Sequence, residues 1–368
     1  MMTNLDRNLF IRVDAGTKIG IGHIMRCLTL AESLKKKFNG VFFISNNIQG
    51  NLSDYVEGMG YKVYQIRGHN HIEGQIIETV KYRRKIQNDV NQCKKIINSY
   101  KNSSNWLLVD HYGIDQRWES KIRNHVEKII VIDDLANRKH DCDILIDQNF
   151  YRDMTERYNK LVPKNCVQIL GSKYALLRKE FTITRKKLKR KNKLKRILVS
   201  FGGSDPTNET SKAMRGLNLL DSQYKMDVVI GNSNPNKNSI KRLCSKIPST
   251  TFHYQVNNMS KIMANADLAI GGGGSMTWER CCMGLPTIVA ILSENQYQLT
   301  KEVAKIGCVI NLGKSDNLKP EDYAHTIKEI NIITIQNMSK KCLRLVDGNG
   351  TKRVTNKIFQ ILIRKNEI

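Results

Sequence analysis

His23 is the residue of this chain with the clearest capacity for acid–base chemistry. It directly follows the turn Gly20-Ile21-Gly22 and stands at the expected start of a helix. Helix amides disfavour protonation of an imidazole at that position, so His23 is predicted to be available as a general base. A second polar group, Asp110-His111-Tyr112-Gly113, ends an apolar run. It is predicted to lie at the same sheet edge, either as part of a site or as a turn with a buried Asp cap.

Two glycine-rich segments in the C-terminal half suit an anionic ligand. GGGGSMTWERCCMGLP, residues 271–286, has glycines that allow close backbone approach, and Ser275 precedes a helix whose amides attract anions. FGGSDPTN, residues 201–208, offers Gly203, the Ser204 hydroxyl and a candidate helix cap. Neither segment has the Walker A pattern or the usual dinucleotide-binding spacing. Together the two loops predict a diphosphate site.

Several acidic residues leave alternatives open. Glu279 lies eight residues after Gly271, where it would either reach a ribose diol or be solvated. Asp133-Asp134 and Asp147 follow apolar runs, and paired carboxylates suggest a metal ion. Adjacent side chains on a strand point to opposite faces, so a shared ion is not required. We predict no metal site and no cofactor.

Short apolar runs that alternate with helix-length polar segments must position these residues. Such runs include LFIRVD and WLLVDHYG, and the pattern restarts after residue 196 with RILVSFGG and ADLAIGGGG. This alternation is typical of α/β domains with a mostly parallel sheet covered by helices. We predict two such domains, residues 1–184 and 197–368, joined by residues 185–196. A ligand is expected in the crevice that faces the carboxyl ends of the strands.

More than a third of the net charge of +26 lies in one run of the chain. The run RKKLKRKNKLKR, residues 185–196, has nine basic residues and no acidic one. It contains no aromatic residue to stack on bases, and no nucleic-acid-binding motif accompanies it. We predict a solvated linker rather than a nucleic-acid arm. A basic RNA-binding or membrane-surface protein is the alternative from a different functional class.

Other sequence features bear on the compartment. No apolar run approaches the roughly 20 residues that span a bilayer, and the first residues do not resemble a signal peptide. The nine cysteines form no CxxC pair and no zinc-binding spacing. We expect a cytoplasmic monomer with reduced thiols that binds neither membrane nor nucleic acid.

Seven segments together resemble the UDP-sugar hydrolases of pseudaminic acid biosynthesis, which act on UDP-2,4-diacetamido-2,4,6-trideoxy-β-L-altropyranose. The resemblance covers nearly the whole chain and extends, more distantly, to the MurG-like glycosyltransferases. It implies a GT-B fold, with two Rossmann-like domains that face an interdomain cleft. The segments are GTKIGIGHIMRCLTLAESL, VDHYGIDQRWE, VIDDLANRKHDCDILIDQNFYR, GSKYALLRKEF, ILVSFGGSDPTN, GGGGSMTWERCCMGLPTIVAILSENQ and LVDGNGTKRV.

The resemblance also implies roles for individual residues. His23 matches the histidine of the GxGH motif, proposed in that family as the base that activates water. Tyr112 matches a tyrosine that lines the sugar site, and Glu279 matches a glutamate that binds ribose. Further substrate contacts are expected from the diphosphate-cradling turn, Gly273, Gly274 and Ser275, and from Gly22 beside His23. Gly203 and Ser204 of the FGGSDPTN loop and a backbone segment near Val256 that reads uracil are also expected to contact the substrate.

The implied reaction is cleavage of the sugar C1–O bond by water with inversion. Its products are UDP and free 2,4-diacetamido-2,4,6-trideoxy-L-altrose. The departing diphosphate carries negative charge toward the glycine-loop amides, so the reaction demands no metal ion. An inverting UDP-sugar glycosyltransferase of GT-B fold is the alternative, and it would need a pocket for a larger acceptor.

Overall fold

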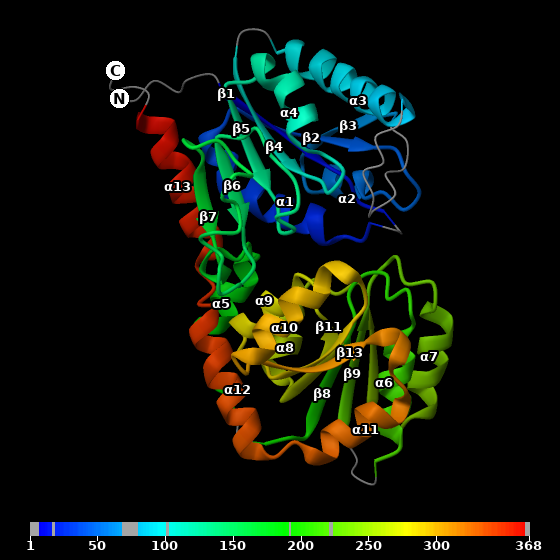
Figure 1. The fold of residues 1–368 in the computed structure, drawn as a ribbon. Coiled ribbons are helices and arrows are strands. Elements are labelled where there is room, and N and C mark those ends of the chain that lie inside the picture. Colours follow the sequence, from blue (N-terminus) through cyan, green and yellow to red (C-terminus); the bar gives the residue numbers. More distant parts are fainter. Residues whose placement is uncertain are drawn as a thin grey trace. The chain divides into compact units, whose positions relative to one another are not determined.

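The computed structural model describes residues 7–16, 19–67, 80–100, 103–190, 193–220 and 224–364. The chain forms two compact units, each built on one sheet with helices packed against it (Figure 1). Paired strands are parallel in both sheets, as the alternating apolar runs predict. The N-terminal unit is Met1–Asn149, Asp153–Leu176 and Thr351–Ile368, and the C-terminal unit is Phe150–Arg152 and Leu177–Gly350.

The sheet of the N-terminal unit has the strand order β3-β2-β1-β4-β5-β6-β7. Its strands are β1 (Arg7–Val13), β2 (Gly40–Asn46), β3 (Lys62–Ile66), β4 (Ser104–Asp110), β5 (Lys128–Ile132), β6 (Ile144–Asp147) and β7 (Val167–Leu170). Its helices are α1 (Gly22–Leu34), α2 (Ser53–Gly58), α3 (Val80–Asn98), α4 (Gln116–Ile122) and α13 (Gly350–Arg364). Single 3₁₀ turns occur at Lys35–Lys37, Arg123–His125 and Ser172–Tyr174.

Side chains of β1 alternate between two helical layers. Leu9, Ile11 and Val13 pack in one core with residues of α1, α2 and α13, whereas Phe10 packs in a second core with residues of α3 and α4. All four are buried completely. Because successive strand residues point to opposite faces, a sheet covered on both faces needs apolar residues at every position. This requirement explains the continuous apolar run in the sequence.

The sheet of the C-terminal unit has the strand order β10-β9-β8-β11-β12-β13. Its strands are β8 (Arg196–Ser200), β9 (Lys225–Ile230), β10 (Thr250–Tyr254), β11 (Leu268–Gly272), β12 (Thr287–Ile291) and β13 (Val309–Lys314). Its helices are α5 (Lys179–Lys186), α6 (Glu209–Asn218), α7 (Lys237–Lys246), α8 (Met259–Asn265), α9 (Met276–Cys282), α10 (Tyr297–Lys305), α11 (Pro320–Glu329) and α12 (Ile332–Leu345). Single 3₁₀ turns occur at Glu294–Gln296 and Ser315–Asn317.

The order of the strands reverses once in each sheet. In the N-terminal unit the reversal lies between β1 and β4, and in the C-terminal unit it lies between β8 and β11. Loops that follow two such strands run in opposite directions, and α/β sheets bind ligands at that point. His23 and Tyr112 lie just after β1 and β4, and the two glycine-rich loops lie just after β8 and β11. Topology thus places the predicted residues at the binding edge of each sheet.

The predicted domain boundaries differ from the observed division at both ends of the C-terminal unit. The last helix, α13, packs with the N-terminal unit, because Val354 and Ile358 are completely buried in a core shared with β1 and α1. At the other boundary, α5 and the basic run 185–196 belong to the C-terminal unit instead of forming a separate linker.

Two arginines attach the basic run to the C-terminal unit. The Arg185 guanidinium donates to three backbone carbonyls, those of Cys282, Leu343 and Val346. The Arg190 guanidinium donates to those of Met263, Ala266 and Met283. Cationic side chains commonly satisfy the last carbonyls of helices in this way. Lys186, Lys187 and Lys189 are exposed, so only the lysines of this part of the run fit the predicted solvated linker.

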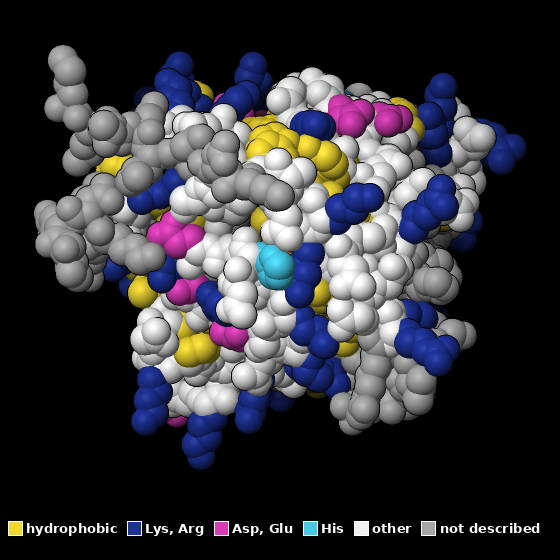
Figure 2. Space-filling view, turned by 90° about the horizontal axis from the view of Figure 1, so that it is seen from above, with side chains coloured by type: hydrophobic (Ala, Val, Ile, Leu, Met, Phe, Trp, Pro, Cys, Tyr) yellow, Lys and Arg dark blue, Asp and Glu magenta, His cyan; other side chains and the backbone are white. Residues whose placement is uncertain are grey.

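Basic side chains are spread over the surface. Figure 2 shows Lys and Arg side chains distributed across much of the displayed face, with fewer acidic side chains between them. Among the described residues, no helix has the length and apolar character needed to cross a membrane.

Gly216 allows α6 to approach α11 closely. A Cβ atom at this position would overlap Pro320 O and lie 2.9 Å from Tyr323 Cβ. Gly216→Ala would force the two helices apart, so we expect a loss of about 1–3 kcal/mol in the free energy of unfolding of the C-terminal unit. Calorimetric or urea-induced unfolding measures this change.

Gly58→Ala is the matched control. Gly58 ends α2, and a Cβ there would have no heavy atom within 4 Å. Alanine favours a helix over glycine, so this variant should be as stable as the wild type or up to about 1 kcal/mol more stable. A Gly216→Ala variant with unchanged unfolding would contradict the packing argument.

Candidate active site

His23 is oriented by a carboxylate from the neighbouring strand. It is the second residue of α1 and is only 8% exposed, and its Nδ1 lies 2.6 Å from Asp110 Oδ1. Asp110 is the last residue of β4, which pairs with β1. The carboxylate at Nδ1 favours the tautomer with its hydrogen on that atom, which leaves Nε2 as the proton acceptor, whereas Arg26 Nη2, 3.1 Å from the same Nδ1, opposes it. The arrangement suits general-base chemistry at Nε2.

Arg26, one turn further along α1, joins two carboxylates. Its Nε and Nη2 donate to Asp110 Oδ2 and Oδ1 at 2.6 and 2.7 Å, and its Nη1 donates to Asp134 Oδ2 at 2.7 Å. Burial alone would favour a neutral Asp110, but Arg26 and His23 hold the pKa of this carboxyl well below its usual value. Asp110 is therefore ionised at neutral pH and can stabilise an imidazolium on His23.

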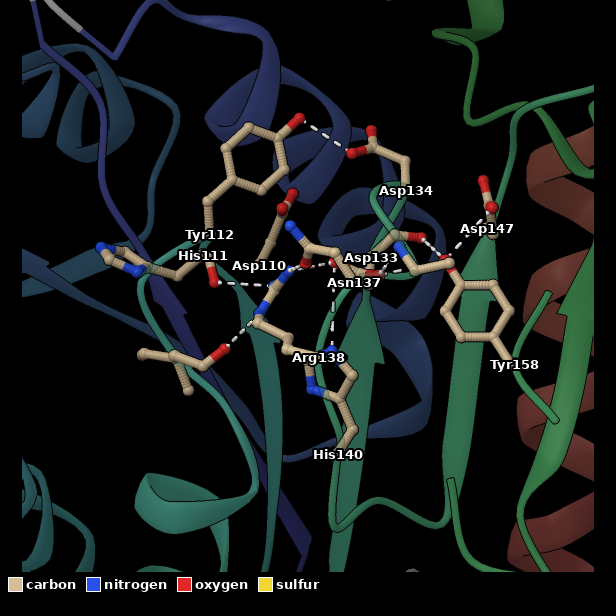
Figure 3. A network of polar contacts seen from close by, with 12 residues as sticks. Asp110, His111, Tyr112, Asp133, Asp134, Asn137, Arg138, His140, Asp147 and Tyr158 are labelled. Carbon is tan, nitrogen blue, oxygen red and sulfur yellow. Dashed lines mark hydrogen bonds and ion pairs between the residues drawn. The ribbon is translucent and has the colours of Figure 1, made fainter. Parts of the chain in front are cut away.

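Tyr112 completes a group that we call the His23 cluster: His23, Arg26, Asp110, Tyr112 and Asp134. The Tyr112 hydroxyl donates to Asp134 Oδ1 at 2.8 Å (Figure 3). Its ring meets the His23 imidazole edge to face, with 4.5 Å between centroids. One guanidinium and two carboxylates give the cluster a formal charge of −1 while His23 is neutral. A proton taken up by His23 would balance that charge.

A second polar network lies at the ends of β5 and β6 (Figure 3). Asp133 pairs with Arg138 at 2.8 Å and accepts a hydrogen bond from the Ala136 amide at 2.9 Å. None of these groups is a partner of the neighbouring Asp134, as expected for adjacent side chains that point to opposite faces. In the described part of the chain, no group of three or more His, Cys, Asp or Glu residues is arranged to hold a metal ion.

Asp147, the last residue of β6, is buried in this network, and Arg157 Nε lies 3.5 Å from its Oδ2. Tyr158 Oη lies 2.9 Å from Asp133 O and 3.1 Å from both Asp133 Oδ2 and Asp147 Oδ2. One hydroxyl donates a single hydrogen, so a proton on Asp147 is needed to make a second of these contacts favourable. Burial first, and then the Asp134 carboxylate, raises the pKa of Asp147 to about 8.

The raised pKa of Asp147 predicts a pH-dependent stability. The unfolded carboxyl has a pKa of about 3.9, so between roughly pH 4 and pH 8 the folded protein binds the extra proton and its stability falls as pH rises. Asp147→Asn mimics the neutral acid and removes this dependence. We expect its stability relative to wild type to increase from pH 5 to pH 8, by at most about 1.4 kcal/mol per pH unit.

Thermal unfolding across a pH series tests this prediction. Asp153→Asn is the control, because Asp153 is exposed and should show no such trend. A difference between Asp147→Asn and wild type that stays constant from pH 5 to pH 8 would show that Asp147 is ionised in the folded protein.

In the C-terminal unit, the loop after β11 is partly filled by its own side chains. The Gly273 amide donates to Gln296 Oε1 at 3.0 Å, and a Cβ on Gly273 would overlap Thr300 Oγ1. Gly273 therefore supplies space, and its amide is already engaged within the unit. Gly274 is less crowded, and Ser275 is exposed with a hydroxyl that makes no helix-capping bond.

The loop after β8 likewise uses some of its own donors. Gly203 lies so close to Gly231 that a Cβ on Gly231 would be 2.6 Å from Gly203 Cα. Asp205 accepts hydrogen bonds from the amides of Glu209 and Thr210 at 2.8 and 3.0 Å. The Asp205 side chain thus caps the first amides of α6, although Asn208 holds the N-cap position, and those two amides are not free for a phosphate group. Ser204 lies half-buried beside them.

Glu279 and Val256 lie at the same edge of this sheet. The Glu279 side chain is 18% exposed, and its Oε1 accepts one long hydrogen bond, of 3.4 Å, from Arg178. Burial raises the pKa of Glu279, whereas Arg178 lowers it. Val256 follows β10 and is half-buried. Their contacts with ribose and uracil stay predictions, but Glu279 is more buried than an ordinary solvated helix residue.

Sequence reasoning missed three contributors to these sites: Arg26, Asp134 as its partner, and Gln296. Arg26 lies three residues after His23, a spacing that places both on one face of a helix and could have indicated it. Gln296 is 23 residues from Gly273, and no local pattern relates the two. Gly22, which opens α1, lies beside His23 as predicted from the chain order.

Part of the chain matches a known domain family. Residues 197–345 match the Glycosyltransferase family 28 C-terminal domain. The match extends from β8 to the end of α12 and so covers most of the C-terminal unit.

Three curated relatives are similar over most of this chain. It is 26% identical to the uncharacterized protein MJ1062 of Methanocaldococcus jannaschii over 80% of its length, but it spans only 58% of that protein. It is 25% identical to the spore coat polysaccharide biosynthesis protein SpsG of Bacillus subtilis, over 94% of this chain and 96% of SpsG. It is 26% identical to the UDP-2,4-diacetamido-2,4,6-trideoxy-beta-L-altropyranose hydrolase of Campylobacter jejuni, over 81% of this chain and 97% of that enzyme.

The fold is shared with a solved glycosyltransferase structure. MurG of Acinetobacter baumannii aligns with a TM-score of 0.67 at 16% identity, over 96% of this chain and 99% of MurG. The two parallel-sheet, Rossmann-like units predicted from the sequence are therefore those of a GT-B fold. Over most of its length the chain is a distant relative of the Campylobacter jejuni hydrolase, and it has the fold of MurG.

Proposed function

We propose that this protein hydrolyses a UDP-sugar, UDP-2,4-diacetamido-2,4,6-trideoxy-β-L-altropyranose, to UDP and 2,4-diacetamido-2,4,6-trideoxy-L-altrose. The His23–Asp110 pair carries the proposal, because hydrolysis needs a base whose proton-accepting nitrogen is held ready for water. Similarity to the named hydrolase over 81% of the chain supports the choice of substrate.

In the proposed reaction, His23 Nε2 takes a proton from water while the water oxygen attacks C1 of the sugar. The bond between C1 and the diphosphate oxygen breaks, and UDP leaves with the electron pair. Attack from the face opposite UDP inverts the configuration at C1. Asp110 acts as a positioning residue that stabilises the imidazolium formed in this step. Gly22 and Tyr112 would line the sugar.

The C-terminal unit would hold the nucleotide. Gly203, Ser204, Gly274 and Ser275 follow the two strands at which the sheet order reverses, where a diphosphate is expected. Gly273 would leave room for it. The Glu279 carboxylate would accept from the ribose hydroxyls, and backbone groups near Val256 would read uracil.

An inverting glycosyltransferase is the second candidate. The family 28 domain match and the fold shared with MurG favour it. In that reaction His23 would deprotonate an acceptor hydroxyl instead of water, and the nucleotide would be held in the same way. The two candidates therefore differ in the nucleophile and in the pocket that a larger acceptor would need.

Product analysis in ¹⁸O-labelled water tests the proposal. We expect the purified protein, given the diacetamido UDP-sugar and no acceptor, to release UDP and free sugar in equal amounts. The label should appear at C1 of the sugar and not in UDP, because the C1–O bond breaks. NMR of the first-formed anomer should show inversion. Label in the UDP would indicate attack at phosphorus, and turnover that requires an added acceptor would favour the transferase.

His23→Asn should lower kcat by about 10²–10⁴-fold and leave UDP binding nearly unchanged, since it removes proton transfer and no nucleotide contact. Asp110→Asn should also lower kcat strongly, because an amide at this position no longer stabilises the imidazolium. Initial rates and UDP calorimetry measure these effects, with thermal unfolding as a check on folding.

His125→Asn serves as the matched histidine control. His125 lies in the N-terminal unit and contacts Asn98, outside the His23 cluster. The His125→Asn variant should turn over substrate at the same rate as wild type. Near-normal turnover by a folded His23→Asn variant would remove His23 from the mechanism.

A further inference from the structure

Arg280 is a buried guanidinium beneath the glycine loop of the C-terminal unit. It lies on α9 and is 2% exposed. Its Nη2 donates to Gly272 O at 2.5 Å and to Thr277 Oγ1 at 3.2 Å, whereas its buried Nε has no hydrogen-bond partner. Both partners of Nη2 are neutral, so nothing in direct contact with Arg280 balances its charge.

This lack of a counter-charge sets Arg280 apart. The described part of the chain has four buried arginines, and the other three, Arg12, Arg26 and Arg138, each form an ion pair with at least one carboxylate. Burial lowers the pKa of Arg280 to about 10, so it remains charged at neutral pH. Removing a charge from water without a paired opposite charge is costly, and proteins rarely retain such a group without a use for it.

The position of the Arg280 guanidinium indicates its role. A Cβ on Gly271 would overlap both Arg280 Nη1 and Ser200 O, so the guanidinium lies against the ends of β11 and β8. These are the two strands between which the sheet order reverses, and the loops at Gly203 and Gly274 follow directly. The guanidinium therefore lies against the two strand ends from which both loops assigned to the diphosphate begin.

Several backbone amides at this edge already donate to acceptors within the unit. Asp205 occupies the amides of Glu209 and Thr210 at the start of α6, and Gln296 occupies the amide of Gly273. A diphosphate that bound here would thus find fewer free amides than a glycine-rich loop suggests. A permanent charge in a low-dielectric setting acts over several ångströms and would make up this shortfall.

We propose that Arg280 is the counter-charge for the diphosphate of the bound nucleotide, acting through the glycine loop as a positioning residue that does not touch the ligand. The inference rests on the proposed function, because it takes the ligand to be a nucleoside diphosphate. In the free protein the buried charge has no ion-pair partner and is offset only in part by the field of Glu279, and the ligand supplies the remaining compensation. The unpaired charge thereby lowers the stability of the free protein and raises its affinity for a multiply charged anion.

Replacement of Arg280 by methionine separates this role from a structural one. Arg280→Met keeps most of the side-chain volume and removes the charge. We expect the free variant to unfold at the same temperature as wild type or higher, because a buried unpaired charge is lost. Calorimetry should show UDP binding weakened by about 10- to 100-fold, UMP binding weakened less, and uridine binding within about twofold. Arg280→Lys, which retains a charge, should lie between wild type and Arg280→Met for UDP.

Arg190→Met is the matched control. Arg190 also donates to backbone carbonyls in this unit, at the ends of helices. Its loss should lower the unfolding temperature of the free protein and leave the affinity of the remaining folded protein for UDP unchanged. The two arginines are therefore expected to give opposite patterns of stability and affinity.

Three results would overturn the inference. The first is unchanged UDP affinity in a folded Arg280→Met variant. The second is a lower unfolding temperature combined with equal losses for uridine and UDP, which would show that Arg280 only supports the loop. The third, which applies if Arg280→Met does not fold, is an Arg280→Lys variant that loses uridine and UDP binding equally. The two proposals can also fail separately. If Arg280→Met weakens UDP binding but the wild-type protein releases no sugar, the result contradicts the proposed hydrolysis and supports the role of Arg280.

Discussion

The Asp110 carboxylate lies at the end of β4, and the N-terminal site is organised around it. One oxygen contacts His23, both accept from Arg26, and Arg26 in turn reaches Asp134, to which Tyr112 donates. Because Asp110 is buried, Arg26 and His23 are the partners that keep a charge there that burial would otherwise disfavour. The orientation of the imidazole thus depends on a balance of charges set by the whole cluster.

The two units share the same kind of sheet topology but differ in how their buried charges are balanced. In each unit the candidate site residues follow the strands at which the strand order reverses, at the carboxyl ends of parallel strands. In the N-terminal unit, buried charges are paired, which fixes side chains precisely and suits a proton-transfer step. In the C-terminal unit, Arg280 is buried against neutral groups, and glycines keep the backbone open. An unpaired charge fixes little by itself, but it favours a ligand of opposite sign.

The high positive charge of the chain also divides into different roles. Arg185 and Arg190 satisfy carbonyls at helix ends, where they hold α5 and the following segment to the C-terminal unit. Neighbouring lysines are exposed, and exposed charges contribute to solubility and to the long-range attraction of anions more than to the fold. Arginine takes the structural positions because its planar fork donates to several carbonyls at once.

The sequence by itself determined the strands of the fold and the positions of the candidate site residues after them. Apolar runs such as LFIRVD become buried parallel strands, since a sheet covered on both faces needs apolar residues throughout, and His23 and the glycine loops follow such runs. Only the tertiary structure decided the partners. Asp110 is 87 residues from His23 and Asp134 is 108 from Arg26, and they meet because β4 pairs with β1 and β5 pairs with β4. The same cause explains three other features: the hydrogen-bonded Gly273 amide, the unpaired Arg280, and the packing of α13 with the N-terminal unit. Hydrogen-bond partners and packing depend on which elements become neighbours, and local sequence periodicity carries no information about that.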